Sequence, residues 1–210
     1  MLYVAHKWAR LPSTAIVIDT TAKSGVWSQL SPFLLPGGDL YEQHTSVNME
    51  NAWQFAKLYA QHAQDGAPTD AYWRWAIAGW SDPKAHRYPM GKGARPLCSW
   101  WEGRTLGYID ARKQIYAPLY RRAVVKTEAY ANLAAMLRIE SRDIYLRDWD
   151  GYDHLAKELT IAEVANNPAK KMGHAFVLWA LLAGRYEELI APTPSPAAPP
   201  GTLDWMATPK

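Results

Sequence analysis

The stretch "SVNMENAWQFAKLY" at residues 46–59 predicts a helix that begins near Ser46 or Asn48 and runs to about residue 62. One face of this helix is apolar enough to pack against a core. The other face carries a carboxylate, an indole, an amide and an ammonium: Glu50, Trp53, Gln54 and Lys57. As an exposed surface pattern this stripe would contribute only about half a kcal/mol to stability. It therefore either faces water or lines a pocket.

Length and composition indicate one domain with a nearly balanced charge. The 210 residues, 49% of them hydrophobic, can bury one full core. The 23 basic and 20 acidic residues give a net charge of +3, which permits an anionic ligand but does not indicate a nucleic-acid-binding protein. A single cysteine, Cys98, excludes an internal disulfide framework and fits a reducing compartment. We expect no signal peptide, no membrane span and a cytoplasmic location.

Tryptophan is unusually abundant, with 11 residues against 3 phenylalanines. A core that needs bulk normally uses phenylalanine and leucine, whereas the indole is amphipathic and stacks well on flat rings. Any single tryptophan is first taken as a core residue. The excess nevertheless indicates that some of the indoles face a ligand.

Local patterns predict one compact, mainly helical α+β domain over residues 1–190 with a few short strands. The predicted strands are 14–19 and the edge-like 144–146, and the further predicted helices are 71–80, 108–126 with a kink or split at Pro118, 128–138 capped by Thr127, about 155–165, and a buried helix from Asn167 and Pro168 to Gly184. Residues 81–107 are irregular and rich in lysine, arginine, glycine and proline, and we expect them to form one wall of a cavity. Residues 191–210 are predicted to be a mobile, proline-rich tail outside the domain.

Most standard catalytic and cofactor motifs are absent from the sequence. There is no dinucleotide-binding G-x-G-x-x-G, no Walker-type phosphate loop, no G-x-S-x-G and no H-E-x-x-H. The six histidines are scattered, and His174 on the buried helix fits a satisfied core histidine better than a metal ligand. The sequence therefore predicts neither a metal nor a cofactor.

Two further clusters join the stripe of residues 50–57 as candidates. An acidic turn surrounds Trp149 and contains Asp148, Asp150 and Asp153. The irregular segment supplies a candidate anion clamp of Lys92, Arg95 and Arg104. Each has a simpler interpretation, since the acidic turn fits a solvated loop and the basic residues fit a surface that favours solubility.

On the basis of these residue clusters, the chain resembles the NADAR superfamily, whose best-known branch is the YbiA-like N-glycosidases. Three segments carry the resemblance: "SVNMENAWQFAKLY", "GKGARPLCSWWEG" at 91–103, and "RDWDGYDH" followed by "KKMGHAFVLWALL". Their order and spacing match over roughly residues 27–184. The sequence departs from the family pattern at the acidic turn, which reads D-W-D-G-Y-D. It also departs at Lys171, where the family often has asparagine.

The resemblance implies hydrolysis of an N-glycosidic bond in a ribosylamino-pyrimidine or purine phosphate, or in ADP-ribose joined to guanine in DNA or RNA. Such a bond breaks through an oxocarbenium-like state that a carboxylate stabilises. Glu50 is the predicted principal carboxylate, Asp150 the second and Asp148 its substitute. Trp53, Trp101 and Trp149 are predicted to stack on the base, and Gln54 to orient the ribose or the water. The residues predicted to bind the phosphates are Lys57, Lys92 and Arg95.

Two alternatives remain open at this point. A module that binds or sequesters ADP-ribose or a related nucleotide needs the clamp and the indoles but not both carboxylates, and the altered acidic turn keeps this alternative open. The weaker alternative is a partner-binding protein whose exposed tryptophans and proline-rich tail form the interface.

Overall fold

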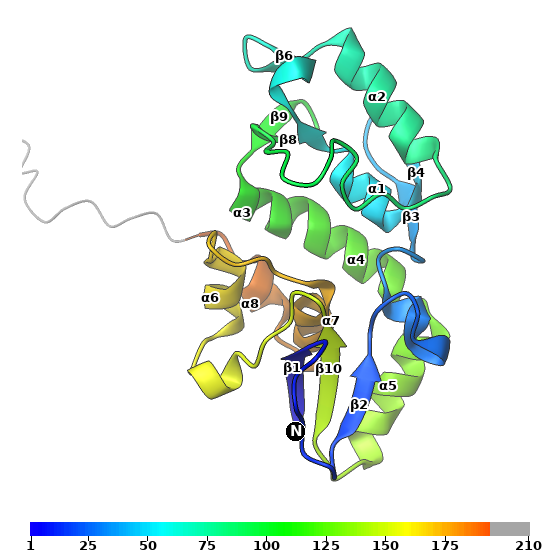
Figure 1. Cartoon of the computed structure of the whole chain (residues 1–210), viewed down its shortest axis with the longest axis vertical. Helices are drawn as coiled ribbons and strands as arrows, with labels where there is room; N and C mark the ends of the chain where they lie inside the picture. Colours follow the sequence, from blue (N-terminus) through cyan, green and yellow to red (C-terminus); the bar gives the residue numbers. More distant parts are fainter. Residues whose placement is uncertain (194–210) are drawn as a thin grey trace, which may run out of the picture.

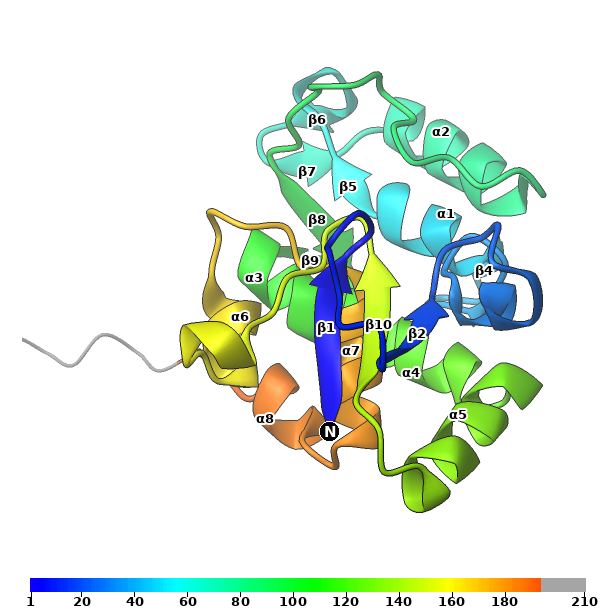
Figure 2. The same cartoon turned by 60° about the horizontal axis from the view of Figure 1, so that its bottom comes forward.

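A parallel three-stranded sheet forms the centre of one half of the molecule in the computed structural model, which describes residues 1–193. Strand β10 (Ile144–Asp148) lies in the middle, between β1 (Leu2–His6) and β2 (Ile16–Asp19). The buried helix α7 (His174–Leu182) packs on this sheet, and Figure 2 shows it behind β1 and β10. The strand predicted at 14–19 is confirmed by β2.

The other half contains short antiparallel pairs around two helices (Figure 1). Helix α1 (Met49–Gln54) begins directly after residue 48, and α2 (Asp70–Ser81) confirms the helix predicted at 71–80. Two of the sheets have two strands, β3 (Pro36–Asp39) with β4 (Thr45–Asn48) and β6 (Ala63–Gln64) with β7 (Ala67–Pro68). The third has three strands, with β8 (Cys98–Trp101) between β5 (Lys57–Leu58) and β9 (Arg104–Leu106).

A long helical segment crosses between the two halves (Figure 1). It consists of α3 (Tyr108–Ala111), a π turn (Arg112–Tyr116) and α4 (Ala117–Val124). The predicted break near Pro118 is confirmed and takes the form of this π turn. Proline has no N–H to donate to the preceding turn, so regular α-helical hydrogen bonding cannot continue through it.

The remaining helices pack around the sheet. The capping prediction for Thr127 is confirmed, since its hydroxyl accepts a hydrogen bond from the Tyr130 N–H at 3.1 Å. These helices are α5 (Glu128–Ile139), α6 (Ile161–Asn166), α8 (Tyr186–Ile190) and the 3₁₀ helices Gly25–Leu30 and Leu155–Lys157. The 3₁₀ helix Ala60–His62 lies instead in the other half, where it contacts α2. With 41% helix and 18% strand, the predicted mainly helical α+β class is confirmed.

The helix predicted over 46–62 is much shorter than expected. Asn48 is its cap, and its side-chain oxygen accepts from the Asn51 N–H at 2.8 Å, while Ser46 belongs to β4. The helix ends at Gln54 because Lys57 and the following residue form β5, which pairs with β8. Pairing between segments about forty residues apart thus overrides the local helical pattern.

Two other predictions were also wrong. The strand around 144–146 is central rather than at an edge, because β1, which the sequence did not reveal, covers its other side. Helix α7 begins at His174 with Gly173 as its cap, and not at Asn167. Its predicted end holds, since Gly184 follows with a positive φ of 68°.

Of the predicted tail 191–210, residues 194–210 lie outside the part that the structure describes. Within residues 1–193, no helix is both long enough and apolar enough to cross a membrane.

The contact between Gly79 of α2 and the Phe55 ring gives the first prediction. A methyl group on Gly79 would lie 2.0 Å from Phe55 Cε1. We expect Gly79→Ala to lower the free energy of unfolding by about 1–3 kcal/mol through overpacking, although alanine in an exposed helix stabilises by about 1 kcal/mol. Denaturant titration measures this. In a Phe55→Leu background the loss should shrink, and a stabilised single variant would contradict the prediction.

Candidate functional site

A cavity of about 830 Å³ opens at the carboxyl ends of β1 and β10, where Lys7 and Asp148 line it. Its other walls come from α1, from the π turn, from residues 87–96 of the irregular segment and from the start of α7. Open α/β sheets bind ligands at this end of their strands, and the volume suits a small molecule. The prediction that the irregular segment forms one wall agrees with this arrangement.

Glu50 is the carboxylate that α1 presents to the cavity, and only 5% of it is exposed. Its Oε1 accepts a hydrogen bond from Gln54 Nε2 at 2.8 Å. Gln54 Oε1 in turn accepts from Lys57 Nζ at 2.5 Å. Among residues 1–193, no cation lies within ion-pair distance of Glu50. The amide of Gln54 therefore links an acid and a base that do not touch.

Burial shifts the pKa values of this acid and this base in opposite directions. Desolvation raises the pKa of Glu50, while the Gln54 hydrogen bond and the charges of Lys57 and Arg87 partly oppose the rise. Desolvation lowers the pKa of Lys57 to about 8, against the opposing effect of Glu50. Shifts of this kind, caused by burial inside a cavity, are typical of functional sites.

Two aromatic rings stand beside Glu50. The Trp53 indole, 9% exposed, packs edge to face on the Tyr116 ring with centroids 5.2 Å apart. Lys57 Nζ lies 5.0 Å from the Trp53 ring centroid. Burial raises the pKa of Tyr116 well above its usual value, and the nearby charge of Glu50 adds to the rise. Tyr116 therefore contributes a neutral phenol to the cavity.

Asp148 is held by the start of α7. Its Oδ2 lies 3.2 Å from His174 Nδ1 and 3.4 Å from the Ala175 N–H, and its Oδ1 accepts from the Trp149 N–H at 2.6 Å. His174 Nε2 lies 2.9 Å from the Thr20 carbonyl oxygen, which can only accept. His174 Nε2 therefore donates to the Thr20 carbonyl oxygen, and this bond fixes the imidazole beside Asp148.

Gly173 makes this packing possible, because a Cβ at that position would lie 1.9 Å from Asp148 Oδ2. Asp150, two residues beyond Asp148, has a different partner. Its Oδ2 lies 3.4 Å from Arg87 Nη2, and both side chains are partly exposed. The two candidate second carboxylates are thus both engaged, one in the interior and one near the surface.

Seven of the ten predicted site residues line this cavity: Glu50, Trp53, Gln54, Lys57, Asp148, Trp149 and Asp150. The stripe of residues 50–57 therefore faces a pocket and not bulk water. The roles assigned to these residues stay predictions.

The other three predicted site residues do not line the cavity. Lys92 and Arg95 are exposed, while their neighbours Gly91 and Ala94 line the wall. Trp101 is a core residue, 6% exposed, that packs against Tyr41 at 4.8 Å. Spacing alone could not show which way each side chain of an irregular segment points.

The two weaker candidates fit their simpler interpretations. Arg104 donates to Gln114 Oε1 at 2.9 Å on the surface. Asp153 accepts from the Ala156 N–H at 2.9 Å within its own turn. Neither residue lines the cavity.

Sequence reasoning missed several lining residues: Lys7, Arg87, Tyr88, Arg112, Tyr116, Lys171 and His174 as a cavity residue. Arg87 lies in the basic segment, so the segment was recognised but the wrong cations were chosen. Arg112 is 2% exposed and donates to the Asn167 carbonyl oxygen at 2.7 Å, so it anchors the loop before α7. The four-residue spacing of positions 108, 112 and 116 ahead of Pro118 was the one pattern that could have indicated a shared helix face lining the cavity.

The charge of the lining favours an anion. Six lysine or arginine side chains face three carboxylates in it: Lys7, Lys23, Lys57, Arg87, Arg112 and Lys171 against Glu50, Asp148 and Asp150. Within residues 1–193, no group of three or more histidine, cysteine, aspartate or glutamate side chains is arranged to hold a metal ion.

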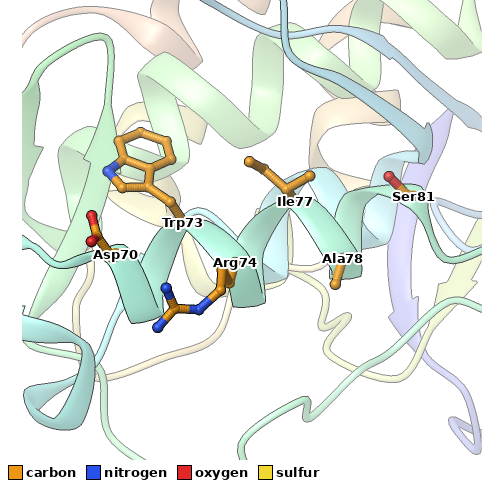
Figure 3. Close-up of a pocket in the computed structure, with 6 residues that line it drawn as sticks. All are labelled: Asp70, Trp73, Arg74, Ile77, Ala78 and Ser81. Carbon is orange, nitrogen blue, oxygen red and sulfur yellow. The ribbon is translucent and has the colours of Figure 1, made fainter.

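A second, shallower hollow lies on the outer face of α2. Figure 3 shows that all six of its lining residues come from that one helix: Asp70, Trp73, Arg74, Ile77, Ala78 and Ser81. It shares no residue with the cavity around Glu50. It lacks the converging walls of the larger cavity, which is the better candidate site.

Comparison with known sequences places the chain in a family. A family model described as "Family of unknown function (DUF6939)" matches residues 4–175. The chain belongs to DUF6939. Every residue that lines the large cavity, from Lys7 to His174, falls within the segment that defines DUF6939. No curated protein and no solved structure matches this DUF6939 chain.

The lowered pKa of Lys57 predicts a dependence of stability on pH. Between the folded pKa of about 8 and the usual value of 10.5, the unfolded chain binds more protons at this lysine than the folded protein does. The buried charge of Lys57 therefore lowers the free energy of unfolding by a few kcal/mol at most. This destabilisation is complete below pH 8 and decreases as the pH rises toward 10.5. The free energy of unfolding of the native protein relative to Lys57→Met should rise between pH 8 and 10. A flat difference would contradict this.

Proposed function

We propose that this protein is a hydrolase that cleaves an N-glycosidic bond in a nucleotide-like substrate. The observation that carries the proposal is the buried carboxylate of Glu50 beside the Trp53 indole, inside a cavity whose lining has an excess of cations. The resemblance of three sequence blocks to N-glycosidases supports the same chemistry. The substrate class is a ribosylamino-pyrimidine or purine phosphate, or an ADP-ribosyl-guanine in DNA or RNA.

Glu50 is placed to act on the sugar. As the bond between the anomeric carbon and the base nitrogen breaks, the electron pair leaves with the base and positive charge develops on the sugar. A carboxylate beside that carbon stabilises the charge or accepts a proton from the attacking water. The water oxygen then bonds the anomeric carbon, and a proton neutralises the departing base. Gln54, bonded to Glu50, fixes the orientation of the carboxylate.

The walls around Glu50 suit the rest of such a substrate. Trp53 offers a flat face for the base. Lys57 and Arg87 offer positive charge for phosphate. Asp150 remains the candidate second carboxylate because it lines the cavity and is partly exposed. Asp148 is better suited to holding His174 and the start of α7 in place than to contacting substrate.

One observation favours the alternative of a nucleotide-binding module without catalysis. Asp148 is engaged by His174, and Asp150 by Arg87. If neither is released when ligand enters, Glu50 acts without a second carboxylate. Binding would then persist while turnover is absent in the native protein.

Replacement of the principal carboxylate tests the enzymatic proposal. We expect Glu50→Gln to lower turnover about 10²–10⁴-fold, which is the usual contribution of a positioned acid or base, while binding remains. Release of free base from ribosylamino-pyrimidine phosphate, NAD and ADP-ribosyl-guanine DNA is measured by chromatography. Glu187→Gln is the matched control, because that side chain is 79% exposed and lies outside the cavity. Substrate affinity without turnover in the native protein would support the binding module.

A pair of arginines tests the anion clamp. Arg87 lines the cavity, whereas Arg95 is exposed and does not. Loss of one charged contact to phosphate is expected to weaken affinity for a ribosyl phosphate about tenfold in Arg87→Ala. Arg95→Ala should stay within about twofold of the native protein in isothermal titration calorimetry. Equal losses in the two variants would show that the clamp is only a diffuse surface charge.

A further inference from the structure

Two exposed tryptophans meet at the edge of the cavity. Trp8 is 72% exposed and Trp149 is 44% exposed, and their ring centroids lie 5.7 Å apart in an edge-to-face contact. Trp149 also lines the cavity. Within residues 1–193, every other tryptophan is buried or half-buried. The two indoles that this part of the chain leaves in water are therefore the two that touch each other beside the candidate site.

The turn that carries Trp8 is firmly held. The Lys7 N–H donates to the Asp148 carbonyl oxygen and the Ala9 N–H to the His6 carbonyl oxygen, both at 2.9 Å. Arg147 Nη2 donates to the Ala9 carbonyl oxygen at 2.9 Å. The bonds to Asp148 and from Arg147 join the turn after β1 to the end of β10, and the bond from Ala9 to His6 closes the turn itself. The indole of Trp8 is thus presented from an ordered backbone, which lowers the entropic cost of stacking a ligand on it.

Positive charge lies between this pair and the interior. Lys7 Nζ is 5.9 Å from the Trp149 ring centroid, and Lys7 itself lines the cavity. Asp19 forms an ion pair with Lys7 and neutralises part of its charge. Lys23 is a second cation of the lining, exposed to solvent. An anionic linker that leaves the cavity past Lys7 would reach the two exposed indoles.

We propose that Trp8 and Trp149 form an outer subsite that stacks a second nucleobase-like ring, joined through phosphate to the sugar held near Glu50. The proposal rests on the proposed function for the identity of the inner site. It narrows the substrate class to ligands with two ring systems. The inner base contacts Trp53, which is 9% exposed, and the outer ring contacts the indoles at the rim. Both a dinucleotide and a short single strand have this chemistry.

The test compares ligands with one and two rings. Isothermal titration calorimetry measures the affinities of AMP, NAD and a two-nucleotide DNA strand for the native protein and for Trp8→Ala. Stacking of a base on an aromatic side chain is worth about fivefold in affinity at the low end of its usual range and more than about a hundredfold at the high end. We expect Trp8→Ala to weaken NAD or the DNA strand by about tenfold or more, and AMP by less than about twofold. Trp8→Phe should restore part of the loss.

The control variant is Ile139→Ala, because Ile139 is 87% exposed and lies at the end of α5, outside the cavity lining. It should leave all three affinities unchanged. The thermal midpoints of all variants should equal that of the native protein. Equal losses for AMP and the two-ring ligands would overturn the outer subsite. So would a native protein that binds the two-ring ligands no more tightly than AMP.

The two probes with two rings also separate the sources. Preference for NAD over the DNA strand would assign the subsite to a free dinucleotide, and the reverse preference to a strand. Failure of the proposed hydrolysis is a separate result, since it appears as absence of released base in the native protein. The affinities measured for Trp8→Ala remain interpretable in that case.

Discussion

The burial of the Glu50 carboxylate is the constraint on which the candidate site depends. A glutamate that is only 5% exposed and has no ion-pair partner within residues 1–193 is costly to keep charged. The structure reduces this cost with the hydrogen bond from Gln54 and with nearby cations that make no direct contact. Stability alone gives no reason for such an arrangement. A chain selected only for folding would place an apolar side chain there, so the burial of Glu50 is the observation that most favours a functional role for this cavity.

The early end of α1 completes this arrangement. In a continuous helix, residues 50 and 57 would be separated by about 10 Å along the axis. The helix instead stops at Gln54, and Lys57 enters β5, whose pairing with β8 returns the ammonium to the Gln54 side chain. The acid, the amide and the base thus form one chain of contacts. Helical spacing predicts that these three residues share one face. In the structure the helix ends at Gln54, and Lys57 reaches the Gln54 side chain from β5.

This difference shows what sequence reasoning could and could not provide. Some features depend only on residues that are close together in the sequence, so they could be predicted. They are the cap at Thr127, the apolar run of α7 and the β-branched run of β2. Other features depend on partners far along the chain, so they could not be predicted. They are strand β1, the central place of β10 and the end of α1. The same limit applies to the site. Glu50 was found because it lies on a short helix, whereas Arg87 was missed in favour of Arg95 because no periodicity governs an irregular segment.

The cavity is made by contacts between distant parts of the chain, and this has a consequence for folding. Lys7 follows the first strand, Glu50 lies on α1, and His174 begins the last buried helix, yet all three line one space. Asp148 joins the end of the central strand to the start of α7, and Gly173 leaves room for that contact. The site therefore cannot form until both halves have docked on α3, the π turn and α4. A substitution that loosens this docking would disrupt the cavity before it unfolds the separate helices, because the walls of the cavity belong to no single element.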